Sequence, residues 1–170
     1  MALVPVGREL ARALLSDRKL SADLAGGLMH RDFPDPDLAA KLPAFAQRLD
    51  DAANSALGHT APRDPAGWGL WLFRYNVERM VVGAASFHGP PNAAGEVAFG
   101  YQIVAPHRRR GLTVEACTAL IDWAFCDTAV SAVTADCSVD NAASIRTLEK
   151  LGFIMERMAR ERLYWRLPRP

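Results

Sequence analysis

A cluster of three arginines and a glycine stands directly between an expected strand and an expected helix, in the stretch APHRRRGLTVEACTALIDWAF from Ala105 to Phe125. Residues Glu96 to Val104 before it are rich in β-branched and aromatic side chains and predict a strand. The residues after it repeat apolar side chains at helical spacing. The first amides of a helix have no intrahelical partner, and the helix dipole favours an anion there. The stretch therefore indicates an anion-binding loop, in which Gly111 leaves the backbone bare and the arginines add charge-assisted bonds.

Composition argues against the other common use of an arginine cluster, which is nucleic-acid binding. The chain has 170 residues, a formal net charge of +1 and 50% hydrophobic residues. This balance is typical of a single globular domain, residues 1–170, and excludes a disordered chain or a strongly basic surface. We therefore expect no nucleic-acid partner. If the arginines did bind nucleic acid, the affinity would fall steeply as the salt concentration rises.

Neither a membrane segment nor a metal site is expected. No apolar run approaches the roughly 18 residues of a membrane span, and the start MALVPVGREL lacks the pattern of a secretory signal, which predicts a cytoplasmic protein without a membrane partner. The histidines are scattered without ligand spacing and predict no metal: His30, His59, His88 and His107. The cysteines lack paired spacing and are expected to be small buried apolar side chains: Cys117, Cys126 and Cys137.

The N-terminal part of the chain predicts mainly helices. Leu3 to Val6 is a weak strand, and Gly7 to Ser16 is a helix with Leu10 and Leu14 on one face. From Asp35 the apolar spacing stays helical across Pro43. Because proline clashes with the preceding turn, we expect two helical pieces here, the second beginning near Leu42 or Pro43.

The rest of the chain predicts strands that end in an alternating strand and helix order. Three strands in succession, joined by short connections, favour an antiparallel meander: Leu70 to Arg74, Met80 to Phe87 and Glu96 to Val104. The helix of the opening stretch then leads to a strand from Ser131 to Ser138, which should lie parallel to the third strand. A helix capped by Asp140 or Asn141 runs through Lys150, and Gly152 ends it. A closing hairpin follows, from Phe153 to Met158 and from Arg162 to Leu167. The fold class is mixed α/β.

Two blocks of the C-terminal part resemble one known family. Arg108-Arg109-Arg110-Gly111-Leu112-Thr113 resembles the R/Q-x-x-G-x-G/A loop of the GNAT family of N-acetyltransferases. The segment from Asn141 to Phe153 is similar to the N-x-x-S and E-K-L-G-F block of its RimJ/RimL-like, ribosomal-protein alanine acetyltransferase branch. Thr113 departs from the pattern, because the family has Gly or Ala at this position. Its hydroxyl either replaces a backbone contact or crowds the phosphate.

The resemblance implies a GNAT fold: a central, mostly antiparallel twisted sheet with one parallel, splayed strand pair and flanking helices. It implies acetyl-CoA as the co-substrate, without a metal. The pyrophosphate of the coenzyme would lie on amides of the arginine loop, and the pantetheine arm between the splayed strands. The residues that the resemblance assigns to the coenzyme are Ile103, Val104, Arg108, Arg109, Arg110, Gly111, Leu112, Thr113, Asn141 and Ser144.

The same resemblance suggests who takes part in the chemistry. An attacking amine must lose a proton, and the departing thiolate needs a donor. Glu96 is the acidic residue of the strand from which the family commonly draws its base, and His88 is the competing base because its ordinary pKa lies near neutrality. For the thiolate, Leu148 stands where many members have a tyrosine, which points to Ser144. Backbone amides near Ile103 and Val104 are expected to bind the oxyanion.

The expected function is acetyl transfer to a primary amine, either a protein N-terminus or a small molecule. The acceptor end would be built from the N-terminal helices, the loop from Arg63 to Gly69 and the closing hairpin. The alternative is a CoA-binding sensor with little or no catalysis, which Leu148 and Thr113 keep open. A homodimer is the default expectation for a soluble protein.

Overall fold

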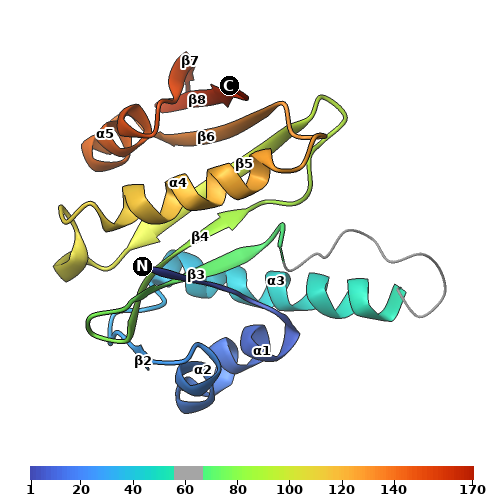
Figure 1. Cartoon of the computed structure of the whole chain (residues 1–170), viewed down its shortest axis with the longest axis vertical. Coiled ribbons are helices and arrows are strands. Elements are labelled where there is room, and N and C mark those ends of the chain that lie inside the picture. Colours follow the sequence, from blue (N-terminus) through green and yellow to red (C-terminus); the bar gives the residue numbers. More distant parts are fainter. Residues whose placement is uncertain (56–66) are drawn as a thin grey trace.

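The computed structural model describes residues 1–55 and 67–170. The first half of the chain forms β1 (Ala2–Pro5), α1 (Arg8–Ser16), α2 (Arg18–Leu24), β2 (Leu28–Met29), α3 (Pro36–Ser55), β3 (Leu70–Tyr75) and β4 (Met80–Phe87). The second half forms β5 (Glu96–Ile103), the short 3-10 turn η1 (Ala105–His107), α4 (Leu112–Phe125), β6 (Ala132–Ser138), α5 (Ala142–Lys150), β7 (Ile154–Ala159) and β8 (Arg162–Pro168). Figure 1 shows these elements as one twisted sheet with helices on its two faces.

The sheet has eight strands in the order β1-β3-β4-β5-β6-β8-β7, with β2 beside β4. The antiparallel meander expected from the sequence is present, since β3 pairs with β4 and β4 with β5. β5 and β6 form the expected parallel pair, joined through α4. This arrangement confirms the mixed α/β GNAT fold.

The parallel pair of β5 and β6 holds together at one end only. Its register runs from Glu96 opposite Ala132 to Ala98 opposite Thr134. Beyond these residues the two strands part, and we call the space between their unpaired lengths the splay gap. The gap opens toward the C-terminal end of β5, where η1 and the arginine loop (residues 105–111) lead into α4.

Two apolar cores hold the layers together, one on each face of the sheet. The first lies under α4 and α5 and includes Phe73, Phe87, Phe99, Leu120, Val133 and Leu148. The second lies under α1 and α3 and includes Leu10, Leu42, Phe45, Leu72 and Val82. Burial of these side chains is the dominant favourable contribution to folding. Trp68 and Trp165 belong to the first core, and Trp71 packs against it.

The expectation of two helical pieces around Pro43 is wrong, because α3 is one helix from Pro36 to Ser55 with Pro43 inside it. The side chains of Leu42, Phe45 and Leu49 are buried on one face of α3, whereas Pro43 lies on the exposed face. The carbonyl four residues earlier, in Ala39, is also in an exposed residue. Water can therefore replace the missing hydrogen bond while core packing keeps the helix continuous.

Smaller differences concern short elements and one cysteine. α2 and β2 were not expected from the sequence. Cys117 and Cys137 are buried as expected, but Cys126 is exposed just beyond the end of α4. Among residues 1–55 and 67–170, none of the helices combines the length and the apolar character needed to cross a bilayer. The part of the predicted acceptor loop from Arg63 to residue 66 lies outside the described residues.

Candidate active site

The arginine loop ends in a helix start whose backbone is open. Gly111 has a φ of 76°, a left-handed conformation that favours glycine, and a Cβ added there would meet nothing within 4 Å. No side chain caps α4. The first backbone hydrogen bond of this helix is donated by Glu115 N to Gly111 O, at 3.0 Å. The backbone N–H groups from Arg109 to Val114 donate to no acceptor in the described part of the chain. This run of free N–H groups at the positive end of a helix dipole fits an anion.

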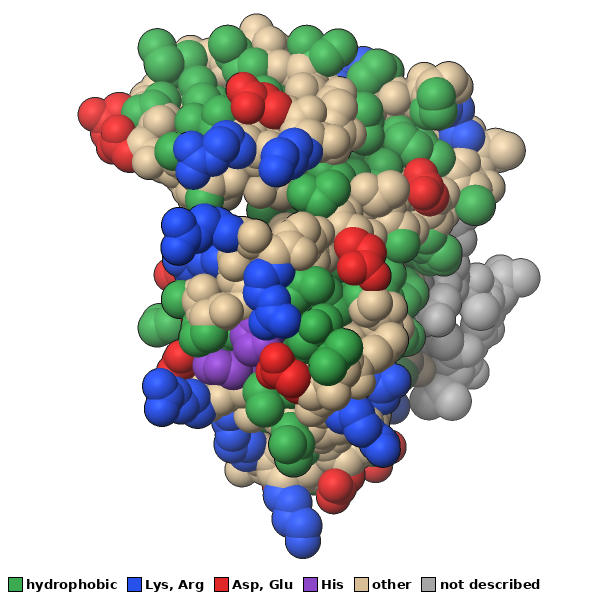
Figure 2. All heavy atoms as spheres, turned by 60° about the vertical axis from the view of Figure 1, so that its left-hand side comes forward, with side chains coloured by type: hydrophobic (Ala, Val, Ile, Leu, Met, Phe, Trp, Pro, Cys, Tyr) green, Lys and Arg blue, Asp and Glu red, His purple; other side chains and the backbone are tan. Residues whose placement is uncertain are grey.

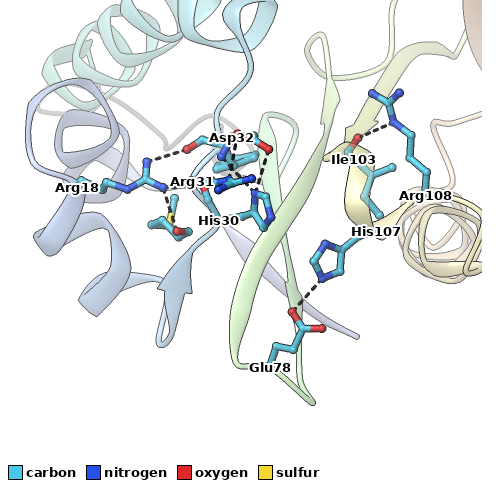
Figure 3. A network of polar contacts seen from close by, with 10 residues as sticks. Arg18, His30, Arg31, Asp32, Glu78, Ile103, His107 and Arg108 are labelled. Atoms are coloured by element: carbon cyan, nitrogen blue, oxygen red, sulfur yellow. Dashed lines mark hydrogen bonds and ion pairs between the residues drawn. The ribbon is translucent and has the colours of Figure 1, made fainter.

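The three arginines of the loop point to three different places. Nε of Arg108 donates to the carbonyl of Ile103 at 3.2 Å, as Figure 3 shows. Arg110 lies over the ring of Tyr75 and donates to its hydroxyl at 3.0 Å. Arg109 has a φ of 58° and is exposed, and its guanidinium has no ion pair with any described residue. Arg109 is thus the arginine whose side chain is free for a ligand, whereas Arg110 offers its backbone N–H.

Basic side chains gather on this face of the molecule. Figure 2 shows Lys and Arg side chains at the height of the arginine loop, below an indentation that separates the part containing α5, β6 and β8 from the rest. Thr113, in the first turn of α4, is half-buried, and its hydroxyl makes no hydrogen bond within the described residues. The hydroxyl is therefore free to bind an anion beside the open amides.

The edge of β5 along the splay gap has free amides as well. Val104 N donates to Val82 O at 2.8 Å, and His88 N donates to Ala98 O at 2.9 Å. Because alternate residues of a strand direct their N–H groups to opposite sides, the amides of Tyr101 and Ile103 face the gap. The Val104 amide is therefore not free to bind an oxyanion, whereas the Ile103 amide is.

The first turn of α5 lies on the other side of the splay gap. Asn141 caps this helix, its Oδ1 accepting from Ser144 N at 3.0 Å. The side chain of Ser144 lies within hydrogen-bonding reach of the Tyr101 phenol, and this contact acts to lower the pKa of Tyr101. Leu148, one turn later, is fully buried in the core and cannot take part.

Tyr101 was not anticipated from the sequence. Its phenol extends from β5 to α5, where its hydroxyl donates to the carbonyl of Ser144 at 3.2 Å. Burial, followed by the nearby Cys117, raises the pKa of Tyr101 well above its ordinary value, so the hydroxyl keeps its proton. In the sequence Tyr101 is one aromatic residue of a strand, and nothing local distinguishes it from a core residue.

Glu96 lies at the opposite, paired end of β5. Its backbone N–H donates to Asn92 Oδ1 at 2.9 Å, and its carboxylate accepts from Nε of Arg166 at 3.3 Å. The side chain is about one-third exposed, at 33%. Glu96 is therefore an accessible carboxylate that is already paired with a cation.

His88 directly follows the last residue of β4, Phe87, beside the paired end of β5. A methyl group placed on Gly100 would lie 3.6 Å from its Nε2, so the imidazole lies over the bare backbone of β5. Burial lowers the pKa of His88 below its ordinary 6.5, and the cations Lys41 and Arg48 act in the same direction while Asp136 opposes them. At neutral pH the ring is consequently uncharged and able to accept a proton.

Within residues 1–55 and 67–170, no group of three or more His, Cys, Asp and Glu side chains is placed to hold a metal ion.

Comparison with known proteins gives the family. Residues 18–154 match the family model described as Acetyltransferase (GNAT) domain. The uncharacterized N-acetyltransferase YjdG of Bacillus subtilis is 38% identical over 99 residues, which cover 58% of this chain and 59% of that protein. The chain thus spans little more than half the length of this curated relative. The chain belongs to the GNAT acetyltransferase family.

Solved structures share the fold over nearly the whole chain. The ribosomal-protein-S5-alanine acetyltransferase from Vibrio fischeri has a TM-score of 0.64 at 15% identity and covers 98% of this chain and 91% of its own. The microcin C7 self-immunity acetyltransferase MccE, in complex with acetyl-CoA and AMP, has a TM-score of 0.60 at 16% identity, with 98% and 91% covered. At these identities the likeness concerns the fold alone.

Proposed function

We propose that this protein transfers an acetyl group from acetyl-CoA to a primary amine. The observation that carries the proposal is the run of free amides from Arg109 to Val114, directly beside the point where the splay gap opens. Membership of the GNAT family supports the same reaction. Acetyl-CoA would supply an acetyl thioester, and the remaining tasks fall to residues of this chain.

The coenzyme would be held along β5 and the start of α4. The amides from Arg109 to Thr113 would bind its pyrophosphate, with the free guanidinium of Arg109 and the hydroxyl of Thr113 beside them. The amides of Tyr101 and Ile103 would bind the pantetheine arm as an added strand. The loop backbone would also contribute, at Arg108, Arg110, Gly111 and Leu112. Val104 would contribute from the start of the loop, and Asn141 from the cap of α5.

Proton transfer needs a base on the acceptor side of β5. The ammonium form of the acceptor must lose a proton before its nitrogen can attack the thioester carbonyl. We propose Glu96 for this step, acting through water. The Glu96 carboxylate is already paired with Arg166, whereas His88 offers a neutral imidazole near the end of the paired region. His88 is accordingly the second candidate for the same role.

Loss of the thiolate needs a hydrogen-bond donor in the splay gap. We propose Ser144, whose hydroxyl lies in the first turn of α5 beside the Tyr101 phenol. Breaking the carbon–sulfur bond leaves a negative sulfur, which accepts the hydrogen bond, while the acceptor nitrogen keeps the acetyl group. Tyr101 holds the backbone of Ser144 and carries a second protonated hydroxyl at the same place.

The acceptor is proposed to be a protein N-terminal amine or a small-molecule amine. Proteins with a similar fold include a ribosomal-protein-S5-alanine acetyltransferase and a microcin C7 self-immunity acetyltransferase, and these two support both classes. A cytoplasmic location and a homodimer belong to the same proposal. The acceptor would approach over α3 and the hairpin of β7 and β8, on the face that carries His88.

Calorimetric titration of the purified protein with acetyl-CoA tests the coenzyme part of the proposal. Binding in the micromolar range is expected. A screen of N-terminal peptides and small amines with a free-thiol readout then tests catalysis. Absence of acetyl-CoA binding would contradict the proposal.

A CoA-binding sensor is the second candidate function. The observation that favours it is the burial of Leu148 in the core, where it cannot donate to a thiolate. Tight acetyl-CoA binding without thiol release for any amine tested would support the sensor and contradict the enzyme.

A further inference from the structure

Glu78, in the turn between β3 and β4, contacts the arginine loop at two points. Its Oε2 lies 2.9 Å from Nε2 of His107, as Figure 3 shows, and its Oε1 lies 3.8 Å from a terminal nitrogen of Arg110. His107 ends η1, and Arg110 directly precedes Gly111. A single carboxylate therefore contacts the loop at two residues, His107 and Arg110.

His107 is fixed in place by its surroundings. It is only 5% exposed, and its ring meets His30 edge-on at a centroid distance of 5.5 Å and Tyr75 at 5.9 Å. Its Nδ1 is buried without a hydrogen-bond partner in the described part of the chain. The bond to Glu78 is thus the polar anchor of this ring, formed by the tautomer that carries its hydrogen on Nε2.

The turn that carries Glu78 is itself held from its far side. Arg79 has a φ of 48°, and its carbonyl accepts from Leu28 N at 2.7 Å. A Cβ on Gly27 would collide with that same carbonyl, so the chain of β2 packs directly against the turn. β2 also pairs with β4 at Leu28 and Met80. The turn is therefore a fixed support rather than a loose loop.

We propose that Glu78 is a positioning residue for coenzyme binding. From the β3–β4 turn it holds His107 and Arg110, and so keeps the free amides of the arginine loop in the arrangement that a pyrophosphate needs. The inference rests on the proposed function, because it concerns the same coenzyme site.

The sign of the effect separates this role from a passive one. A carboxylate near an anion site weakens anion binding by repulsion, so removal of a passive Glu78 would tighten the coenzyme. Removal of a positioning Glu78 weakens binding, because the loop loses its anchor. Glu115 is the matched control, since it is a carboxylate in the first turn of α4 that pairs with the N-terminal ammonium and not with the loop.

The test is calorimetric titration with free CoA of the wild type and of Glu78→Gln, Glu78→Ala and Glu115→Gln. We expect Glu78→Ala to weaken binding about tenfold, with Glu78→Gln in between, since its amide oxygen still accepts from His107 but no longer attracts Arg110. Glu115→Gln should bind equally or more tightly. In assays with an acetyl acceptor, KM for acetyl-CoA should rise in the Glu78 variants while kcat stays within about twofold.

Equal or tighter binding in the Glu78 variants would overturn the inference. If Glu78→Ala does not fold, Glu78→Gln alone decides by the same criterion. Failure of the wild type to bind CoA would contradict the proposed function instead, so the two outcomes are distinguishable.

Discussion

The two ends of β5 carry two different parts of the proposed reaction and are built in different ways. At the C-terminal end, the arginine loop and α4 present a row of backbone amides that no described residue uses. At the N-terminal end, Glu96 and His88 are side chains whose properties depend on Arg166, Lys41, Arg48 and Asp136 from other elements. One end binds through local backbone geometry, whereas the other depends on charges brought together by the fold.

This difference determines how each end responds to substitution. Free amides at a helix start bind any suitable anion, so only a change that blocks or distorts the backbone removes the site. A base depends on its pKa, which each neighbouring charge shifts. We therefore expect large, localised effects at the arginine loop and graded, pH-dependent effects at the other end.

The largest expected effect is at Gly111. Gly111→Glu should lower acetyl-CoA affinity by about 100-fold or more, because a carboxylate beside the amides repels the pyrophosphate and the left-handed φ disfavours a side chain. Gly111→Asn is the control, since asparagine tolerates this φ and brings no charge, and a Cβ fits there without a clash. Calorimetry measures both. Equal losses in the two variants would assign the effect to backbone strain alone.

The next effect concerns the base. Replacement of the residue that acts as the base should lower kcat/KM about 100-fold. The variants Glu96→Gln and His88→Ala are therefore compared. If His88 is the base, kcat/KM falls as the pH drops through a pKa below 6.5, because protonation removes the accepting nitrogen. If Glu96 is the base, His88→Ala leaves that limb of the profile unchanged. Unchanged rates in both variants would remove both residues from the mechanism.

The same contrast explains how much of the molecule could be predicted from the sequence. The strand, arginine loop and helix order and the Asn141 cap are local patterns, so adjacent residues were enough to predict them. The hydrogen bonds of Tyr101 to α5 and of Glu78 to His107 join residues far apart in the chain. No sequence pattern around these residues predicts that they meet. Pro43 was misread because a local rule was overridden by packing of Leu42, Phe45 and Leu49 against the sheet.

A smaller effect on kcat is expected from the two hydroxyl donors at the splay gap, Ser144 and Tyr101. Ser144→Ala and Tyr101→Phe are each expected to lower kcat about tenfold if both hydroxyls stabilise the thiolate, while KM for acetyl-CoA changes little. If Tyr101 acts only by holding the backbone of Ser144, the double variant will be no slower than Ser144→Ala alone. Tyr164→Phe, on β8, is the control. Steady-state rates of thiol release decide between the two roles.

The smallest effect tests whether the fold tunes His88 through charge. Lys41 lowers the pKa of His88 and Asp136 raises it, so neutralising them should move that pKa in opposite directions. Lys41→Gln should move the acid limb of kcat/KM to higher pH, and Asp136→Asn should move it to lower pH. Both shifts should shrink in high salt, since exposed charges are screened. NMR titration of the His88 ring measures the same two shifts without turnover. Absence of a shift in both variants would mean that burial alone sets this pKa, and that the N-terminal end of β5 is as indifferent to distant charges as the arginine loop.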